Sequence, residues 1–211
     1  MGIVLFFAEG AAAMFGVWVE DKGGTRFINE LANRKVRADA IVAIGHPCVI
    51  YTSLENAKNV IIGKNMTPEI YERARKTGVV KEYPTLKAMA DDLKIPYEEL
   101  KKTNDTFNGY MTAKKDPDFD CMFFDDGKPN TDGPFLAVRL WPRVHHCMGG
   151  LEINDNAQVL SVRGKVINGL YAAGEVTGGV HGMVRLGTVA VADCMIFGRV
   201  AARTAMKFKG C

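Results

Sequence analysis

The residues best suited to chemistry lie in one glycine-rich stretch, residues 144–187. Glycine loses backbone entropy and has no side chain to bury, so it is expected where a backbone turns tightly or approaches a ligand. Charged and imidazole side chains among such glycines suit an anionic or hydrogen-bonding ligand. The alternative is a set of glycine-punctuated β-hairpins with surface charges. The polar candidates are His145, His146, Glu175, His181 and Arg185, and the glycines are those at 149, 150, 164, 169, 174, 178, 179, 182 and 187.

Three motifs along the chain resemble those of one enzyme family. They read H-H-C-M-G-G at residues 145–150, G-L-Y-A-A-G-E-V-T-G-G-V-H-G-M-V-R-L-G at 169–187 and R-F-I-N-E-L-A-N-R at 26–34. Together they resemble the flavoprotein subunit of soluble fumarate reductases, in the wider flavocytochrome c and urocanate reductase family. The resemblance implies an FAD-dependent oxidoreductase that transfers a hydride from flavin N5 to fumarate, urocanate or a similar α,β-unsaturated carboxylate.

The resemblance implies a catalytic arginine and a relay carboxylate. Arg34 corresponds to the arginine that the family uses as its active-site acid, and Glu9 corresponds to the relay carboxylate. A guanidinium is a weak acid, so it donates a proton only when it is oriented on the substrate and quickly reprotonated. Ala12 replaces a second arginine of the family, which is compatible with a substrate other than fumarate, such as urocanate. The alternative for Arg34 is a surface ion pair with Glu30 at helical spacing.

The other motif residues are implied to bind substrate and cofactor. Arg185 corresponds to the arginine that holds a substrate carboxylate, a role suited to a two-pronged guanidinium. One of His145 and His146 corresponds to the substrate-binding histidine, and His145 is favoured. Glu175 corresponds to an acid that hydrogen-bonds FAD hydroxyls, and His181 to a residue of the flavin or substrate wall. Further FAD contacts are implied for Gly149, Gly150, Gly174, Gly187, Thr188 and Val189, and no metal site is expected.

One departure from the family lies at the start of the last predicted helix. The family has R-L-G-G-N-A where this chain has R-L-G-T-V-A at residues 185–190. Thr188 and Val189 can still offer backbone N–H groups to the flavin edge, because helix N-termini carry unpaired donors. They lack the side-chain amide that the family supplies there.

The predicted fold class is α+β, with two domains. Residues 1–142 are similar to the capping, or clamp, domain that closes over substrate, and residues 143–211 to the C-terminal segment of a Rossmann-like FAD-binding domain. The sequence lacks the G-x-G-x-x-G loop that marks the N-terminal dinucleotide-binding βαβ unit. The chain is therefore expected to be a fragment or half of a split protein, inactive and weak in FAD binding by itself. The missing FAD-domain segment or self-association would complete it.

Local patterns predict the elements that position these residues. Residues 15–28 read as a hairpin with its turn at 21–24. Asn29 is expected to cap a helix that ends at Gly45, and Thr67 to cap a helix that runs to Lys76. The last helix, 187–208, is expected to turn one apolar stripe inward, toward a sheet that this chain does not contain. Other predicted elements are an apolar run at 3–7, strands at 48–51 and 135–141, helices at 85–93 and from Pro96, and a loop at 114–133; the stripe comprises Ala190, Val191, Cys194, Phe197, Gly198 and Ala201.

Composition excludes several functional classes. The net charge is +3 and no Lys/Arg run exceeds two residues, which argues against nucleic acid as a partner. Five scattered cysteines without a C-x-x-C pair argue against a zinc site or a disulfide framework. No apolar stretch is long enough to cross a membrane, so a soluble protein is expected, cytoplasmic or periplasmic according to sequence upstream.

Two other functions are compatible with the sequence. The chain could be a non-catalytic module that folds alone or with a partner and binds no flavin. It could also belong to a sister FAD enzyme that desaturates its substrate, such as a ketosteroid dehydrogenase. Arg34 and Arg185 argue against the second function, because a steroid has no carboxylate for them to hold. The sequence leaves open the identity of the acid, the electron donor and the oligomeric state.

Overall fold

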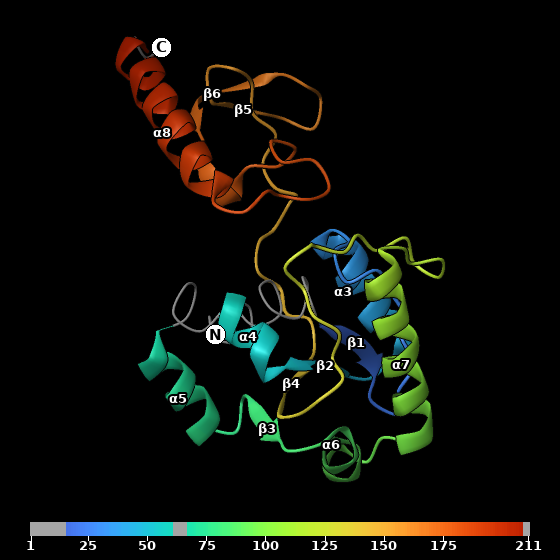
Figure 1. The fold of residues 1–211 in the computed structure, drawn as a ribbon. Coiled ribbons are helices and arrows are strands. Elements are labelled where there is room, and N and C mark those ends of the chain that lie inside the picture. The colour runs from blue at the N-terminus through green and yellow to red at the C-terminus, as the bar shows by residue number, and fades with distance from the viewer. Residues whose placement is uncertain (1–15, 61–66, 209–211) are drawn as a thin grey trace. The chain divides into compact units, whose positions relative to one another are not determined.

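The computed structural model describes residues 16–60 and 67–208. The chain forms two compact units, an N-terminal unit of residues Met1–Pro142 and a C-terminal unit of residues Arg143–Cys211 (Figure 1). The sequence analysis places its domain boundary between the same two residues, Pro142 and Arg143. The apolar run at 3–7 and the predicted relay residue Glu9 lie outside the described residues. Within the described ranges, every helix falls short of the length or apolarity needed to span a bilayer.

A four-stranded antiparallel sheet organises the N-terminal unit, with strand order β1-β2-β4-β3. The predicted hairpin is present in a shorter form, because only a single bridge from Val19 to Arg26 continues the pairing after the turn. In that turn Gly24 N donates to Glu20 O at 3.0 Å. The strands are β1 (Val17–Glu20), β2 (Cys48–Ser53), β3 (Lys81–Tyr83) and β4 (Phe135–Leu140).

Within the described residues, five helices cover the two faces of this sheet. Thr67 caps its helix as predicted, since its hydroxyl accepts from Ile70 N–H, and the structure shows that Thr85 caps the next helix by accepting from Ala88 N–H. The prediction that Asn29 caps the first helix is wrong. Its side-chain amide instead donates to the carbonyls of the 114–133 loop, and Asn33 is the cap. The helices are α3 (Arg34–Ile44), α4 (Leu54–Val60), α5 (Pro68–Lys76), α6 (Leu86–Leu93) and α7 (Tyr97–Ala113).

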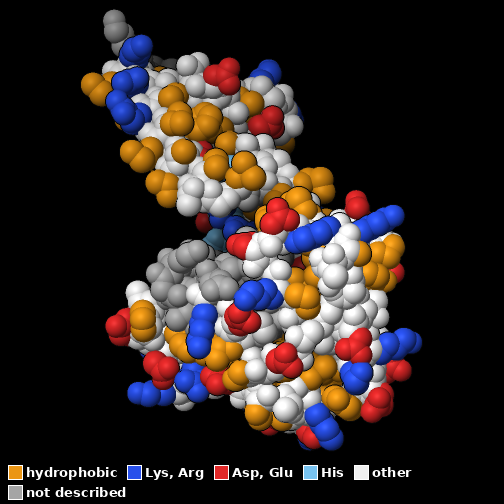
Figure 2. All heavy atoms as spheres, viewed as in Figure 1, with side chains coloured by type: hydrophobic (Ala, Val, Ile, Leu, Met, Phe, Trp, Pro, Cys, Tyr) orange, Lys and Arg blue, Asp and Glu red, His pale blue; other side chains and the backbone are white. Residues whose placement is uncertain are grey.

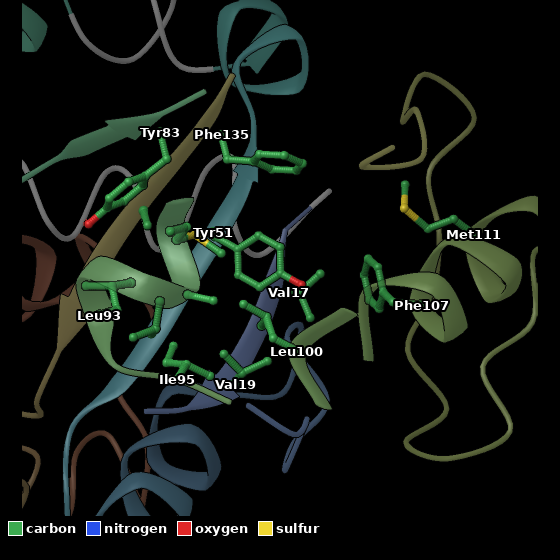
Figure 3. Packing of buried hydrophobic residues seen from close by; sticks show 14 residues of the cluster. Val17, Val19, Tyr51, Tyr83, Leu93, Ile95, Leu100, Phe107, Met111 and Phe135 are labelled. Atoms are coloured by element: carbon green, nitrogen blue, oxygen red, sulfur yellow. The ribbon is translucent and has the colours of Figure 1, made fainter. Parts of the chain in front are cut away.

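Alternation along the central strands divides the core into two clusters. Ile50 and Leu136 face the side of α3, α4 and α5, whereas Tyr51 and Phe135 face the side of α6 and α7. Figure 3 shows the Tyr51 ring at the centre of the second cluster, with Leu100 of α7 beside it. Every residue of β2 is buried, as expected for an interior strand covered on both faces.

The predicted loop, residues 114–133, contains neither helix nor strand. Buried polar contacts hold it at both ends. At the far end Asn130 is fully buried. Its side-chain oxygen accepts from Ser53 N at 2.7 Å, and its carbonyl accepts from the amides of Asn104 and Asn108 of α7. Asn130 thus joins β2 to α7 through hydrogen bonds that are shielded from solvent, because its side chain is fully buried.

Removal of the Asn130 side chain is expected to destabilise the N-terminal unit. In Asn130→Ala the buried Ser53 N–H loses its acceptor, and an unpaired buried group costs about 1–3 kcal/mol. Asp126→Ala, at an exposed position of the same loop, is the matched control and should be close to neutral. Urea unfolding measured by tryptophan fluorescence reports on this unit, because Trp18 and Trp141 both lie in it. Equal midpoints for the two variants would contradict this role of Asn130.

The C-terminal unit contains a β-hairpin and one long helix. Strands β5 (Gln158–Leu160) and β6 (Val166–Tyr171) pair antiparallel, the one-turn η1 (Gly174–Val176) follows, and α8 spans Val189–Lys207. This part of the chain exposes many apolar side chains, some of which Figure 2 shows as orange patches. Both faces of β6 are open, because a two-stranded hairpin and one helix provide too little surface to cover one another.

The predicted apolar stripe of α8 is left largely uncovered by the described residues, in agreement with the prediction that it faces a sheet which this chain does not contain. Val191 and Cys194 are exposed, and Phe197 is only half-buried. The buried residue of this helix is Asp193. Among the described residues the main neighbours of α8 are η1 and β6, which provide no broad sheet against which an apolar stripe can pack.

Candidate functional site

Two of the motifs meet through direct backbone pairing in the C-terminal unit. Leu151 N donates to Val176 O at 2.9 Å, and Gly178 N donates to Leu151 O at 3.0 Å. A Cβ on Gly150 would lie 2.3 Å from Val176 O, and a Cβ on Gly178 would lie 2.6 Å from Gly150 N. These two glycines therefore allow one backbone segment to press against another. Gly149 has no such neighbour.

The pairing brings both histidine-bearing motifs to one place. His146 Nδ1 lies 3.4 Å from Glu175 Oε2, and the other oxygen of Glu175 accepts from Cys147 N at 2.9 Å. The rings of His146 and His181 meet edge to face with centroids 5.4 Å apart. On its other side His181 Nε2 lies 3.3 Å from Asp193 Oδ2. Four side chains thus form a row with a carboxylate at each end.

His145 differs from its neighbour. It is exposed, whereas the His146 side chain retains only 6% of its accessible surface. The sequence could not separate the two histidines, but their surroundings do. His146 is held inside the unit, and the side chain of His145 is accessible.

Arg185 is buried, with 8% of its surface exposed. Its Nη1 donates to Leu186 O at 2.9 Å. Its Nε is buried and has no hydrogen-bond partner among the described residues. A buried guanidinium without a carboxylate partner favours a bound anion, because an uncompensated buried charge is costly.

The start of α8 retains unpaired backbone donors. Thr188 precedes the helix with a left-handed φ of 67° and makes no side-chain cap. Its hydroxyl donates to Gly187 O at 2.6 Å. Gly174 has a φ of 79°, and a Cβ there would lie 2.8 Å from Cys194 Sγ, so glycine is required for η1 to meet the helix. The four predicted FAD-binding positions Gly174, Gly187, Thr188 and Val189 therefore lie at or near this helix terminus.

Arg34 is the first residue of α3 and is exposed. The alternative of a surface ion pair with Glu30 is wrong, because Glu30 is fully buried. Its carboxylate accepts from Arg26 Nε at 2.8 Å and from Arg26 Nη2 at 2.7 Å. The segment that leads into Arg34 is therefore held from inside the unit, which leaves Arg34 at the surface.

Arg26 joins two buried carboxylates. Its Nη2 lies 2.7 Å from Glu30 Oε2 and 2.7 Å from Asp116 Oδ2, between the rings of Phe107 and Phe119. Burial raises the pKa of the Glu30 carboxyl. Burial acts in the same direction on Asp116, but the hydrogen bond and charge of Arg26 outweigh it and lower the pKa of that carboxyl.

Glu30, Asp116 and Cys121 offer ligand atoms within 4.8 Å of one another, a spacing compatible with a metal ion. Two observations argue for a structural cluster instead. Arg26 already occupies both carboxylates. Burial also raises the pKa of the Cys121 thiol to about 12, so the thiolate that a metal requires is disfavoured.

Comparison with known proteins places the chain in a family. The model of the FAD binding domain family matches residues 2–191. The chain belongs to this family. The related oxidoreductases are flavoproteins, and FAD is the cofactor that this family of domains binds.

Three similar proteins give the family context. The acrylate reductase flavoprotein subunit of Shewanella woodyi is 40% identical over 191 residues, which are 87% of this chain and 36% of that protein. The open conformation of a flavocytochrome c3 fumarate reductase has a TM-score of 0.69 at 34% identity, over 93% of this chain and 33% of that one. The 3-ketosteroid delta1-dehydrogenase of Sterolibacterium denitrificans has a TM-score of 0.74 at 25% identity, over 94% of this chain and 40% of that one.

These comparisons confirm the resemblance to fumarate reductase flavoproteins and the mixed helix-and-strand fold. The chain spans about a third of the length of the acrylate reductase subunit that it matches. The sequence analysis missed Asp193. A signal was present, since Asp193 is the one charged residue between Arg185 and Arg199, inside an otherwise apolar run.

Proposed function

We propose that this chain is part of an FAD-dependent reductase of α,β-unsaturated carboxylates. The observation that carries the proposal is the buried Arg185, whose Nε has no hydrogen-bond partner among the described residues. A substrate carboxylate supplies the charge and the acceptors that this guanidinium lacks. The similarity to an acrylate reductase and to a fumarate reductase supports a small unsaturated acid, and urocanate belongs to the same chemical class.

We assign residues 1–142 to the capping domain and residues 143–211 to the C-terminal segment of the FAD domain. The longer relatives support a partner segment that supplies the rest of the FAD site. The apolar side chains exposed on β6 and α8 are available to such a segment or to a second copy. The chain by itself is expected to retain little FAD and to be inactive.

The C-terminal unit fits one edge of FAD. The half-exposed Glu175 can accept from cofactor hydroxyls, and the uncapped N–H groups at Thr188 and Val189 can donate to the carbonyl edge of the ring. When bound, FAD supplies the hydride. Gly150 and Gly174 contribute by allowing close backbone contacts, which shape the surface that these donors and acceptors occupy.

The chain's own residues then orient the substrate and supply a proton. Arg185 holds one carboxylate with parallel hydrogen bonds, and the exposed His145 provides a further hydrogen bond. Arg34 donates the proton to the substrate carbon and regains it through a relay that includes Glu9. Fixed donors of this kind accelerate the reaction by placing the reacting atoms rather than by new chemistry.

A sister FAD enzyme that dehydrogenates a steroid is the second candidate. Its support is the likeness to 3-ketosteroid delta1-dehydrogenase. A neutral steroid offers Arg185 no counter-charge, so the buried guanidinium favours the carboxylate reductase.

The function is tested in a chimeric reductase that carries this chain in place of the matching segment of the Shewanella woodyi acrylate reductase subunit. We expect reduction of acrylate, fumarate or urocanate with an artificial electron donor. Arg185→Lys should raise KM at least about tenfold with a smaller change in kcat, because one charge-assisted hydrogen bond contributes roughly 1.5–3 kcal/mol.

The matched control is Arg163→Lys, at an exposed position of the same unit, which should leave both constants unchanged. Steroid dehydrogenation without reduction of any unsaturated acid would replace the proposal by the second candidate. An unchanged KM in Arg185→Lys would remove Arg185 from the substrate site.

A further inference from the structure

Asp193 is buried where a carboxylate is costly. It is the buried residue of α8, with 5% of its surface exposed, on a helix that otherwise leaves apolar residues open. Removing a carboxylate from water costs several kcal/mol unless an opposite charge or hydrogen bonds compensate it. An aspartate at such a position therefore has a specific partner.

That partner is His181. Asp193 Oδ2 lies 3.3 Å from His181 Nε2, and the two side chains retain 3% and 9% of their accessible surface. The two atoms are close enough for an ion pair, but the angle between them does not meet the geometry of a hydrogen bond. Asp193 Oδ1 and His181 Nε2 both lack hydrogen-bond partners among the described residues. The contact has the distance of an ion pair, which forms when His181 is protonated, and it places the carboxylate directly against the imidazole.

His181 also contacts His146, the second residue of the histidine pair. The His181 ring meets the His146 ring edge to face at 71°, and Glu175 Oε2 lies 3.4 Å from His146 Nδ1. Glu175 also accepts from Cys147 N at 2.9 Å, so it holds the backbone next to His146 as well as the ring. The row Glu175, His146, His181 and Asp193 thereby fixes the backbone segment that begins at His145.

We propose that Asp193 is a positioning residue for His145, acting through His181 and His146. His145 directly precedes His146 in the chain, so the backbone that the row holds at His146 and Cys147 also fixes the place from which the His145 side chain extends. That side chain is exposed, whereas His146 is held inside the unit. The assignment of His145 to substrate rests on the proposed function, whereas the row itself does not.

Nuclear magnetic resonance of the whole chain tests the row, because the sequence contains only four histidines. In protein labelled with ¹⁵N in histidine, Asp193→Asn removes the charge and preserves the shape of the side chain. We expect shifts of the ring nitrogens of His181 and His146 and of the backbone amide of His145. His46, in the N-terminal unit, should not shift. Asp155→Asn, at an exposed position of the same unit, is the matched control and should shift none of them.

A further measurement covers the case in which Asp193→Asn does not fold. The unsubstituted chain should show nuclear Overhauser contacts between the ring protons of His146 and His181, since their centroids are 5.4 Å apart. Absence of these contacts, or unshifted His146 and His145 signals in a folded Asp193→Asn, overturns the proposal. Neither measurement uses flavin or turnover. A chimeric reductase without activity would therefore refute the function and leave the row intact, whereas unshifted signals would refute the row alone.

Discussion

Arg34→Lys in the chimeric reductase is expected to lower kcat at least about a hundredfold, the lower end of what a positioned acid contributes. Arg34 begins α3, where the helix dipole disfavours a cation, so its presence there does not serve helix stability. Lysine keeps the charge but has one nitrogen on a flexible stem, which cannot reproduce the fixed guanidinium geometry toward substrate and relay. Flavin content and its reduction by an artificial donor should be unchanged.

The adjacent cation provides the control for Arg34. Lys35 is exposed on the same turn of α3 and pairs with Asp39 four residues later. Lys35→Arg should leave kcat within about twofold, because exposed ion pairs of this kind contribute little. Near-normal turnover in Arg34→Lys would show that the proton comes from another residue.

Arg26→Met is expected to lower the free energy of unfolding of the N-terminal unit by about 3–5 kcal/mol, the cost of removing one partner from a buried ion pair. The substitution leaves the carboxylates of Glu30 and Asp116 buried without a counter-charge. It also removes one of the links between the segment before α3 and the 114–133 loop, which Arg26 joins together with Asn29. Urea denaturation followed by tryptophan fluorescence measures the loss.

Arg75→Met tests whether burial is the cause. Arg75 also pairs with two carboxylates, those of Glu72 and Glu82, but its side chain is 40% exposed. Its removal should cost less than about 1 kcal/mol, because solvent screens exposed pairs. The triple variant Arg26→Met, Glu30→Gln, Asp116→Asn should recover part of the loss, since no unpaired charge remains. Equal losses in the two single variants would contradict the structural role of Arg26.

Local chemistry predicted the N-terminal unit well where it acts over a few residues. Thr67 was predicted to cap its helix and does so, because a hydroxyl three residues before a free N–H needs nothing from the rest of the fold. Asn29 could not be predicted in the same way. Its amide bonds to carbonyls of Phe119 and Asp120, about 90 residues along the chain, and that contact displaced the cap to Asn33.

The candidate site was predictable as a set of residues but not as a set of contacts. The motifs named His146, Glu175 and His181, yet their spacing does not show that the two rings touch. Asp193 was missed because helical periodicity assigns the buried face to apolar residues, and here the buried residue is charged. The sequence assigned Gly150 to the cofactor, and the structure shows a second reason for this glycine, because the backbone of Val176 occupies the place where a Cβ would lie.

The pairing of Leu151 with Thr177 closes the base of a loop that contains the whole β5–β6 hairpin. This pairing makes the two glycine-rich motifs direct backbone neighbours. The tip of the hairpin is far from this base along the chain, and Val162 there is fully exposed. An epitope or a dye-binding peptide inserted beside Val162 lengthens a surface turn and leaves the junction untouched. This turn is thus the natural attachment point for labelling the protein in experiments on its histidines.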